Sequence, residues 1–257
     1  MQQIRTRADS PRAQNTHNTQ PTRSDGAALP PTMFAQTEHL TLRAYRDSDL
    51  ALLHALWNDP QVQRTGTNEG VVPRGPKWAR DTLPAQMETS LLHVIIEVTD
   101  PSAHEPRGED DGAARKGAEV EGEKFVGCCL LQMPNAKNRD AALAIVLVPR
   151  WWGRGFGAEA VRWTVDCGFE NPGLHRISLA VMDGNDRAVS LYTKLYVDVW
   201  SVRGVLGAVT NGWLVLYSGF VVEGRKRECS WLENGWKDYI TMGMLRREWA
   251  ALRAARI

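Results

Sequence analysis

The pattern of apolar and polar positions along the chain predicts strands that alternate with helices. Apolar runs rich in β-branched residues predict strands at His39–Ala44, Leu91–Val98, Phe125–Gln132, Ala141–Val148, Arg176–Val181, Phe220–Glu228 and Trp236–Met244. Apolar residues at helical spacing predict helices at Asp47–Asn58, at Phe156–Glu170 and from Ala188 to Leu195. This order of elements predicts an α/β fold in which helices pack on the faces of one mixed sheet.

The predicted helices carry recognisable ends and faces. Asp47 or Ser48 can cap the first helix, which is expected to stop at Asp59-Pro60. Asn185 is a natural N-cap for the third helix. The inner face of the second helix is predicted to consist of Phe156, Ala160, Trp163 and Cys167.

Three stretches fall outside this alternation. Residues 1–33 hold few large apolar side chains, so we expect a disordered tail before one folded domain at residues 34–257. Residues 101–122 contain four glycines and six acidic residues, which predicts a flexible, solvated loop. Residues 196–218 are apolar and β-prone instead, with Asn211-Gly212 as a candidate hairpin turn.

Composition and charge limit the classes of function. The chain has 257 residues and a formal net charge of +1, so no excess of basic residues is available for nucleic acid. No run of eighteen apolar residues and no secretory signal is visible, so we expect no membrane partner. The spacing of the cysteines fits neither a metal site nor a disulfide framework, which favours a reducing, cytoplasmic location. The four are Cys128, Cys129, Cys167 and Cys229.

Several aromatic and sulfur-containing side chains have mainly structural interpretations. Trp57, Trp163 and Trp249 are expected to pack in the core or to cover it. Apolar surroundings predict that Cys128, Cys129 and Cys167 are inert, buried thiols.

A glycine-rich turn between the strand that ends at Val148 and the helix that begins at Phe156 carries the clearest chemistry. Glycines there leave backbone N–H groups unshielded at the positive end of the helix dipole. Such a turn can bind a pyrophosphate, and Arg154 adds a positive charge. The spacing is neither that of a dinucleotide-binding fold nor that of a P-loop. The glycines are Gly153, Gly155 and Gly157.

The turn resembles the acetyl-CoA-binding motif of the GNAT superfamily of N-acetyltransferases, Gln/Arg-x-x-Gly-x-Gly/Ala. The motif fits from Arg150 or from Trp152, and the second register is similar to that of the ribosomal-protein-type (RimJ/RimL-like) branch. Later segments resemble the next strand, helix and final strands of that branch, and the likeness runs from about Phe34 to Trp249. These segments are His175-Arg-Ile-x-Leu-x-Val181, Asn185-x-x-Ala188-x-x-Leu191-Tyr192-x-Lys194-Leu195, Gly219-Phe-Val-Val-Glu-Gly224 and Asn234-Gly-Trp-x-Asp238.

The resemblance implies a twisted, mostly antiparallel sheet that splays at its centre, with helices on both faces. It implies an enzyme that moves an acetyl group from acetyl-CoA to a primary amine, either a protein N-terminus or a small amine, with no metal. Tyr192 would protonate the departing CoA thiolate, and the backbone near Val146 and Val148 would pair with the pantetheine arm. Asn185 would contact the cofactor or only cap its helix. The expected pyrophosphate-binding residues are Trp152, Gly153, Arg154, Gly155, Phe156, Gly157 and Ala158.

The sequence departs from the family pattern at two places. Ala142 stands where many relatives have a glutamate, so the general base is unassigned; Glu97 and His93 are substitutes, although a lone histidine in an apolar run is more often a packed residue. Residues 196–218 interrupt a sequence motif that is continuous in relatives. This stretch is either an in-frame insertion, such as translated intron sequence or a gene-model error, or a genuine hairpin of the family.

Two other functions fit the same residues. The missing carboxylate and the interrupting stretch are compatible with a protein that binds acyl-CoA without catalysis. The glycine-rich turn by itself is also compatible with a nucleotide-binding regulator. The acceptor surface is assigned to the weakly patterned stretch from Gln61 to Ser90, which reveals no specificity, and the oligomeric state stays open.

Overall fold

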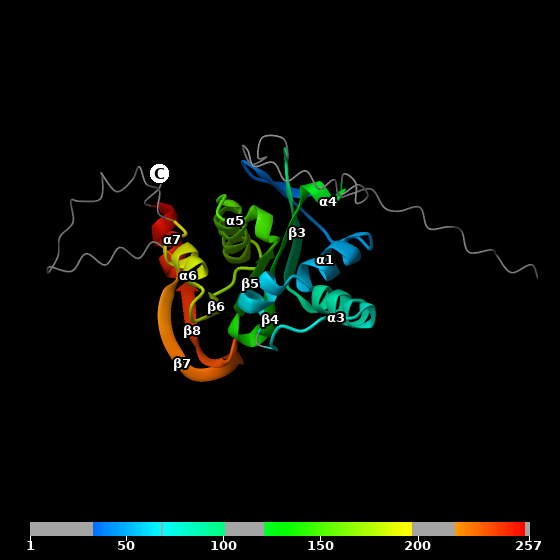
Figure 1. Cartoon of the computed structure of the whole chain (residues 1–257). Coiled ribbons are helices and arrows are strands. Elements are labelled where there is room, and N and C mark those ends of the chain that lie inside the picture. The colour runs from blue at the N-terminus through cyan, green and yellow to red at the C-terminus, as the bar shows by residue number, and fades with distance from the viewer. Residues whose placement is uncertain (1–32, 68, 101–120, 197–218, 255–257) are drawn as a thin grey trace, which may run out of the picture. The chain divides into compact units, whose positions relative to one another are not determined.

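A computed structural model describes residues 33–67, 69–100, 121–196 and 219–254 (Figure 1). The chain separates into two units, Met1–Pro30 and Pro31–Ile257, and every described element belongs to the second. Apart from Met33, the predicted tail at 1–33 lies outside the described residues. So do nearly all of the predicted loop at 101–122 and residues 197–218 of the interrupting stretch.

The described strands form one eight-stranded sheet in the order β1-β2-β3-β4-β5-β6-β8-β7. All neighbours are antiparallel except β5 and β6, which are parallel. All seven predicted strands are present, so the predicted sheet is confirmed. The strands are β1 (Met33–Gln36), β2 (Leu40–Arg43), β3 (Leu92–Val98), β4 (Phe125–Asn135), β5 (Asp140–Leu147), β6 (Arg176–Met182), β7 (Val221–Leu232) and β8 (Gly235–Leu245).

The helices include the three that the sequence predicts and several that it does not. Helix α2 begins where Asp59 accepts a hydrogen bond from the Gln61 N–H, and Pro60 occupies its first turn. Helix α3 buries few apolar residues, and these are too few to give a clear helical period. The helices are α1 (Asp49–Trp57), α2 (Pro60–Gly66), α3 (Pro76–Thr89), α4 (Glu121–Lys124), α5 (Phe156–Glu170), α6 (Asp186–Thr193) and α7 (Arg246–Ala254), with short 3-10 turns η2 (Ala136–Asn138) and η3 (Pro149–Trp151).

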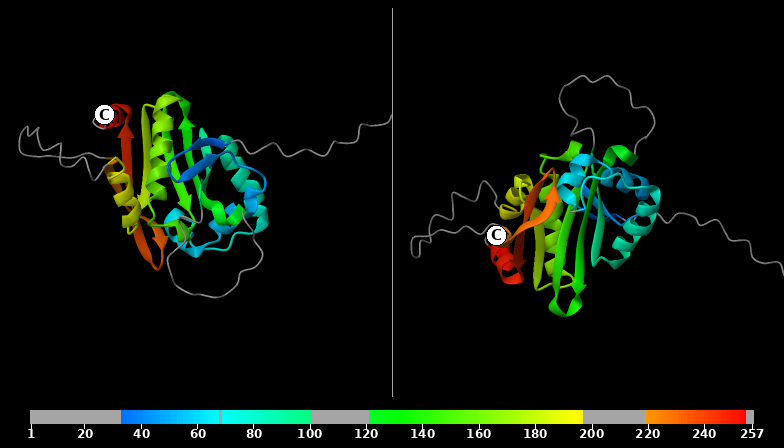
Figure 2. Two further views of the ribbon diagram at one scale, coloured as in Figure 1. Left: turned by 90° about the horizontal axis from the view of Figure 1, so that it is seen from above. Right: turned by 60° about the horizontal axis from the view of Figure 1, so that its bottom comes forward.

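Helices cover both faces of the sheet. Two neighbouring residues on β4 show this, because their side chains point to opposite faces. Cys128 on β4 packs in the cluster that α1 and α3 cover, whereas Cys129 packs under α5, where the Thr164 hydroxyl donates to its sulfur at 3.3 Å. Burial raises the pKa of both thiols to about 12, as expected for inert cysteines. Figure 2 shows the two groups of helices from two further directions.

The buried face of α5 differs from the prediction. Phe156 and Ala160 are buried as expected, but Trp163 and Cys167 are only half-buried. The helix spans two core clusters, so its buried stripe shifts along its length and continues through Val161, Val165 and Phe169. Trp249 on α7 stacks on Phe169, whereas Trp57 on α1 is half-buried.

The sheet opens between its two central parallel strands. The register of β5 and β6 contains only Asp140 with Arg176, Ala141 with Ile177, and Ala142 with Ser178. Beyond these three pairs, β5 continues to Leu147 and β6 to Met182, but the two strands do not pair with each other. The predicted splay is therefore confirmed, and it starts beyond Ala142.

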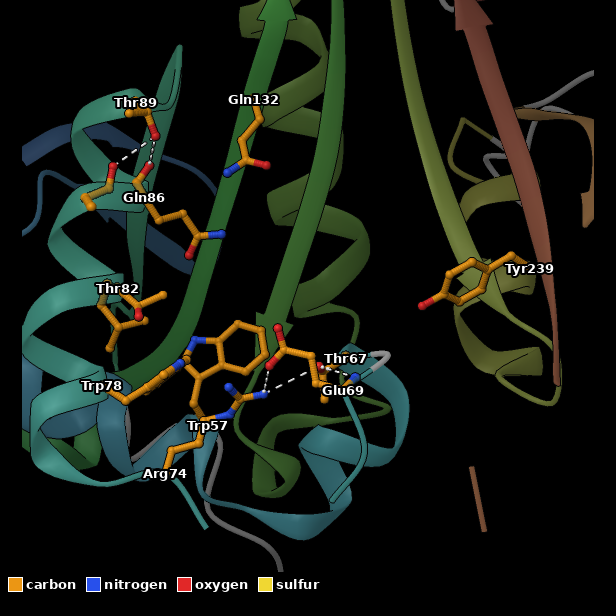
Figure 3. A pocket seen from close by; sticks show the side chains of 13 residues that line it. Trp57, Thr67, Glu69, Arg74, Trp78, Thr82, Gln86, Thr89, Gln132 and Tyr239 are labelled. Atoms are coloured by element: carbon orange, nitrogen blue, oxygen red, sulfur yellow. Dashed lines mark hydrogen bonds and ion pairs between the residues drawn. The ribbon is translucent and has the colours of Figure 1, made fainter. Parts of the chain in front are cut away.

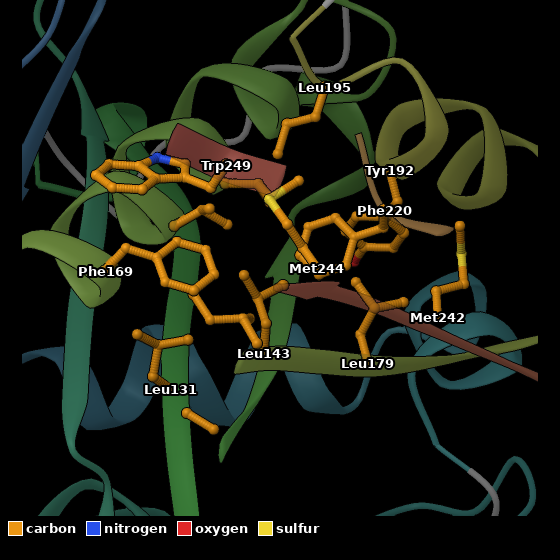
Figure 4. Packing of buried hydrophobic residues seen from close by; sticks show 14 of the residues in the cluster. Leu131, Leu143, Phe169, Leu179, Tyr192, Leu195, Phe220, Met242, Met244 and Trp249 are labelled. Carbon is orange, nitrogen blue, oxygen red and sulfur yellow. The ribbon is translucent and has the colours of Figure 1, made fainter. Parts of the chain in front are cut away.

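The two sides of the undescribed segment 197–218 pack directly against each other. Tyr192, Leu195 and Phe220 lie in one buried cluster (Figure 4). The Phe220 N–H donates to the Tyr192 carbonyl at 2.9 Å, and a Cβ on Gly219 would lie only 2.1 Å from that oxygen. The end of α6 and the residues before β7 are therefore neighbours in the core.

A buried ion cluster fixes α1 to the sheet. Arg43 on β2 donates to both carboxylate oxygens of Asp49 at 2.7 Å, and its other side contacts Glu97 on β3 at 2.6 Å. Arg43 and Asp49 are 3% and 2% exposed. The two carboxylates compensate the charge of the buried guanidinium.

Replacing Asp49 by Asn leaves Arg43 buried with one carboxylate instead of two. We expect the free energy of unfolding to fall by about 3 kcal/mol, the scale of a broken buried pair. Urea denaturation measures this loss. Asp81→Asn is the control, because Asp81 pairs with Lys77 on an exposed helix face and its loss should cost below about 1 kcal/mol. Equal losses in both variants would contradict the role of the cluster.

Candidate functional site

The glycine-rich turn has the backbone conformation that only glycine adopts without strain. It follows β5 and η3 and leads directly into α5. Gly153 and Gly155 have φ values of +77° and +88°, in the left-handed region. A Cβ on either glycine would meet nothing within 4 Å, so the backbone conformation rather than lack of space requires glycine.

The turn exposes a row of backbone N–H groups without acceptors. The Trp152 N–H donates to the Pro149 carbonyl, and the next backbone bond is that of Glu159 to the Gly155 carbonyl. Between them, four N–H groups make no hydrogen bond within the described part of the chain. N–H groups without acceptors at a helix start can bind a phosphate group. The four belong to Gly153, Gly155, Gly157 and Ala158.

Cationic and aromatic side chains frame this turn. The Arg154 guanidinium lies over the Trp151 ring, 5.1 Å from its centroid. Arg187, in the first turn of α6, lies 4.8 Å over the Trp152 ring. These contacts attach the start of α6 to the turn and add positive charge beside its N–H groups.

A carboxylate in the first turns of α5 anchors the helix to the β1–β2 connection. Glu159 accepts hydrogen bonds from the His39 N–H at 2.8 Å, from the His39 ring and from the Thr37 hydroxyl. Burial alone would raise the pKa of Glu159, but these hydrogen bonds outweigh it and lower the pKa. The carboxylate therefore stays ionised near the positive end of the helix.

The β4–β5 ladder shows which way the backbone groups of two predicted binding residues, Val146 and Val148, point. The Val148 N–H donates to the Val126 carbonyl on β4 at 2.9 Å. A Cβ on Gly127 would lie 2.1 Å from the Val146 oxygen, so that carbonyl also points at β4. Backbone groups alternate in direction along an antiparallel ladder. Ile145 and Leu147 therefore point theirs at the other edge of β5, which faces β6 and is unpaired beyond Ala142; we call it the open edge. The ladder therefore favours Ile145 and Leu147 over the predicted Val146 and Val148 as partners of the pantetheine arm, and this pairing stays a prediction.

Tyr192 lies on α6, and Asn185 directly precedes this helix. Tyr192 is 7% exposed and packs edge-on against Phe220, with 5.8 Å between ring centroids. Its hydroxyl makes no hydrogen bond within the described residues, and burial raises its pKa, so the proton stays on the oxygen at neutral pH. Asn185 is the N-cap and accepts from the Ala188 N–H at 3.2 Å.

A cavity of about 510 Å³ opens on the face of the sheet that α1 and α3 cover (Figure 3). Its wall continues from α3 across Gln132 on β4 to Tyr239 on β8, and Figure 3 shows these two residues on opposite sides of the open sheet. The cavity therefore extends to β4 and β8, the strands that flank β5 and β6 on either side of the split. It is lined by Trp57, Gly66, Thr67, Glu69, Arg74, Trp78, Thr82, Leu83, Ala85, Gln86, Thr89, Gln132 and Tyr239.

The two substitutes for the missing base lie elsewhere. Glu97 is held by Arg43, and neither Glu97 nor His93 lines the cavity. Burial lowers the pKa of His93 to about 4. Most cavity residues come from the stretch Gln61 to Ser90, where the start signals Asp59-Pro60 and Gly75-Pro76 could have revealed two helices.

Two further kinds of site are not found in the described residues. No group of three or more His, Cys, Asp or Glu side chains among them could hold a metal ion. None of the helices described is long and apolar enough to cross a membrane.

Comparison with known proteins places this geometry in context. The family description "Acetyltransferase (GNAT) domain" matches residues 39–196. An uncharacterized N-acetyltransferase p20 of Bacillus licheniformis is 27% identical over 162 residues, 62% of this chain and 79% of that protein. The spermidine N(1)-acetyltransferase of Escherichia coli K12 is 28% identical over 165 residues, 64% and 74% of the two chains.

Solved structures share the fold. A GNAT-family acetyltransferase from Bacillus anthracis has a TM-score of 0.58 at 18% identity. The aligned region covers 84% of this chain and 100% of the Bacillus anthracis chain. A spermidine N-acetyltransferase from Vibrio cholerae, solved with CoA and spermine, has a TM-score of 0.55 at 22% identity, and covers 82% and 98%.

Replacing Gly155 by Ala tests the turn as a binding site for CoA. A residue with a Cβ at this positive φ is strained by about 1–2 kcal/mol, so the turn should shift and the N–H groups lose their alignment. We expect calorimetry to show a dissociation constant for CoA raised by about tenfold or more. Gly75→Ala is the matched control, because Gly75 has an ordinary φ of −75° and nothing near its Cβ position. Unchanged affinity in Gly155→Ala would remove the turn from the site.

Proposed function

The chain belongs to the GNAT acetyltransferase family, and on that premise we propose that it moves an acetyl group from acetyl-CoA to the primary amine of a small molecule or of a protein N-terminus. One observation carries the proposal. Among the described residues, four N–H groups in the turn after β5 have no acceptor, and beyond Ala142 the edge of β5 that faces β6 is also unpaired. A pyrophosphate and an extended amide chain, linked as they are in CoA, need these two features side by side.

The chain's own residues fit each part of the cofactor. The turn from Trp152 to Ala158 would hold the pyrophosphate with its N–H groups, and Arg154 would add charge. The open edge at Ile145 and Leu147 would pair with the amide-containing arm. When bound, acetyl-CoA supplies a thioester carbonyl, the group that the amine attacks.

The open edge also has a role in the chemistry. The N–H groups of Ile145 and Leu147 are fixed by the β4–β5 ladder, so they need no reorganisation during the reaction. An N–H held at the thioester carbonyl stabilises the negative charge that develops on its oxygen. Positioning both reactants in the split lowers the barrier further.

Tyr192 is the proposed proton donor to the departing sulfur. Its hydroxyl is protonated at neutral pH because burial raises its pKa, and no described residue accepts its proton. A buried hydroxyl without a protein partner favours a role toward a ligand. Asn185 orients the start of α6 as its cap, and a contact with the cofactor stays part of the proposal.

The missing carboxylate at Ala142 supports a second candidate function, CoA binding without catalysis. Glu69 is the one carboxylate among the cavity-lining residues described, and Arg74 already holds it. We therefore assign no general base. The RimJ/RimL-like resemblance favours a protein N-terminus as acceptor, whereas the spermidine acetyltransferases among the relatives favour a small amine.

Release of free CoA thiol from acetyl-CoA in the presence of an amine panel tests the proposal. We expect release with at least one amine, and Tyr192→Phe should lower kcat by about 10²-fold or more with little change in KM. Tyr45→Phe is the matched control, since Tyr45 lies in the α1–α3 cluster away from α6. Tight CoA binding without thiol release on any amine would favour the second candidate. An unchanged kcat would remove Tyr192 from the mechanism.

A further inference from the structure

A buried guanidinium forms part of the cavity wall. The side chain of Arg74 is 7% exposed, and its guanidinium carbon lies 4.4 Å from the centroid of the Trp78 ring. Figure 3 shows it below Trp57, beside Glu69 and Thr67. A cation kept from water at this depth needs an anion as partner.

The backbone around Arg74 holds this cation in place. The Arg74 N–H donates to Asn58 Oδ1 at 2.7 Å. Its carbonyl accepts from the Asn58 amide at 3.0 Å and from His54 Nε2 at 2.6 Å. The backbone of Arg74 is thus fixed to the end of α1, and the Trp78 ring and Glu69 hold its guanidinium before any ligand binds.

The guanidinium has donors to spare. Nη2 contacts the Glu69 carboxylate at 2.9 Å and, at 3.5 Å, the Thr67 hydroxyl. Nε is buried without a hydrogen-bond partner in the described part of the chain. The partner Glu69 is itself 64% exposed, so water screens its charge and a second carboxylate can replace it. A planar guanidinium matches a carboxylate with two parallel hydrogen bonds.

The charges of the cavity disfavour a polycation. Arg74 and Glu69 are the charged residues of its described lining, and the positive one is the more deeply buried. A polyamine would bring several positive charges to a buried cation with one exposed acid to offset them. The relatives named spermidine acetyltransferases therefore do not define the acceptor of this chain.

The cavity connects Arg74 with the place where the sheet opens. Gln132 pairs with Ala142, the last residue of β5 that pairs with β6, and Tyr239 pairs with Met182 at the end of β6. The cavity that Arg74 lines is therefore continuous with residues on both sides of the split. The indole of Trp57 and the side chain of Leu83 provide apolar walls for its body.

We propose that the acceptor is a small amine that carries a carboxylate, as an amino acid does, and that Arg74 binds this carboxylate. The proposal rests on the proposed function, because it names the acceptor class of the same site. Arg74 is a specificity residue that touches the acceptor and takes no part in the proton transfers.

Matched pairs of amines test the proposal: α-amino acids of different side chains, each compared with the amine that lacks its carboxylate, with spermidine added. We expect at least one amino acid to exceed its decarboxylated partner and spermidine in kcat/KM by about tenfold or more. Arg74→Gln should abolish that preference, because it should lower kcat/KM for the amino acid by about tenfold more than kcat/KM for the decarboxylated amine. Arg80→Gln, on the exposed side of α3, is the matched control and should change neither.

A second variant keeps the test valid if Arg74→Gln does not fold. Glu69→Gln removes an exposed competitor for the guanidinium, so KM for the amino acid should fall several-fold relative to KM for its decarboxylated partner. Preference for spermidine, or for the decarboxylated amine in every pair, would overturn the proposal. So would a preference for amino acids that survives in Arg74→Gln.

Calorimetry of the amino acids with the CoA-bound protein separates this proposal from the proposed function. Binding that Arg74→Gln abolishes, without thiol release on any amine, would support the carboxylate site and contradict acetyl transfer. Thiol release that is indifferent to the carboxylate would support acetyl transfer and contradict the carboxylate site. Absence of both binding and turnover with every amino acid would also overturn the carboxylate site.

Discussion

The parting of β5 from β6 after Ala142 is the constraint on which the rest of the structure depends. Backbone N–H and C=O groups in the middle of a sheet ordinarily pair with a neighbouring strand, and leaving them unpaired is costly. Within the described part of the chain, the unpaired edge of β5 leads into a turn in which the N–H groups of Gly153, Gly155, Gly157 and Ala158 also lack acceptors. Two adjacent deficits of hydrogen bonding create one elongated site for a polar, partly anionic ligand.

Contacts on all sides stabilise this opening. Glu159 ties the start of α5 to the β1–β2 connection, and Arg187 ties the start of α6 to the turn through Trp152. Arg162 on α5 donates twice to the Leu195 carbonyl, at 3.1 and 2.8 Å, and so fixes the end of α6 as well. Helices α5 and α6 thus connect the two halves of the sheet on one face. The cavity lies on the other face, which α1 and α3 cover.

The sequence predicted the strands and the main helices because their apolar positions repeat with clear periods. It also located the turn, since the left-handed φ values of Gly153 and Gly155 require glycine. It missed the parity of β5, because Val146 and Leu147 are equally apolar and only the pairing with β4 tells which backbone faces the split. The sequence also did not reveal the cavity, because the helix that forms much of its wall has few buried residues. Helix α3 buries only Ala79 and Leu83, so its period is weak.

Titration of the isotope-labelled protein with CoA, followed by amide NMR, tests the central claim most directly. The account predicts that the amides of Gly153, Gly155, Gly157 and Ala158 shift strongly and saturate together with those of Ile145 and Leu147. Saturable shifts confined to other residues, or no saturable shift at all, would contradict it.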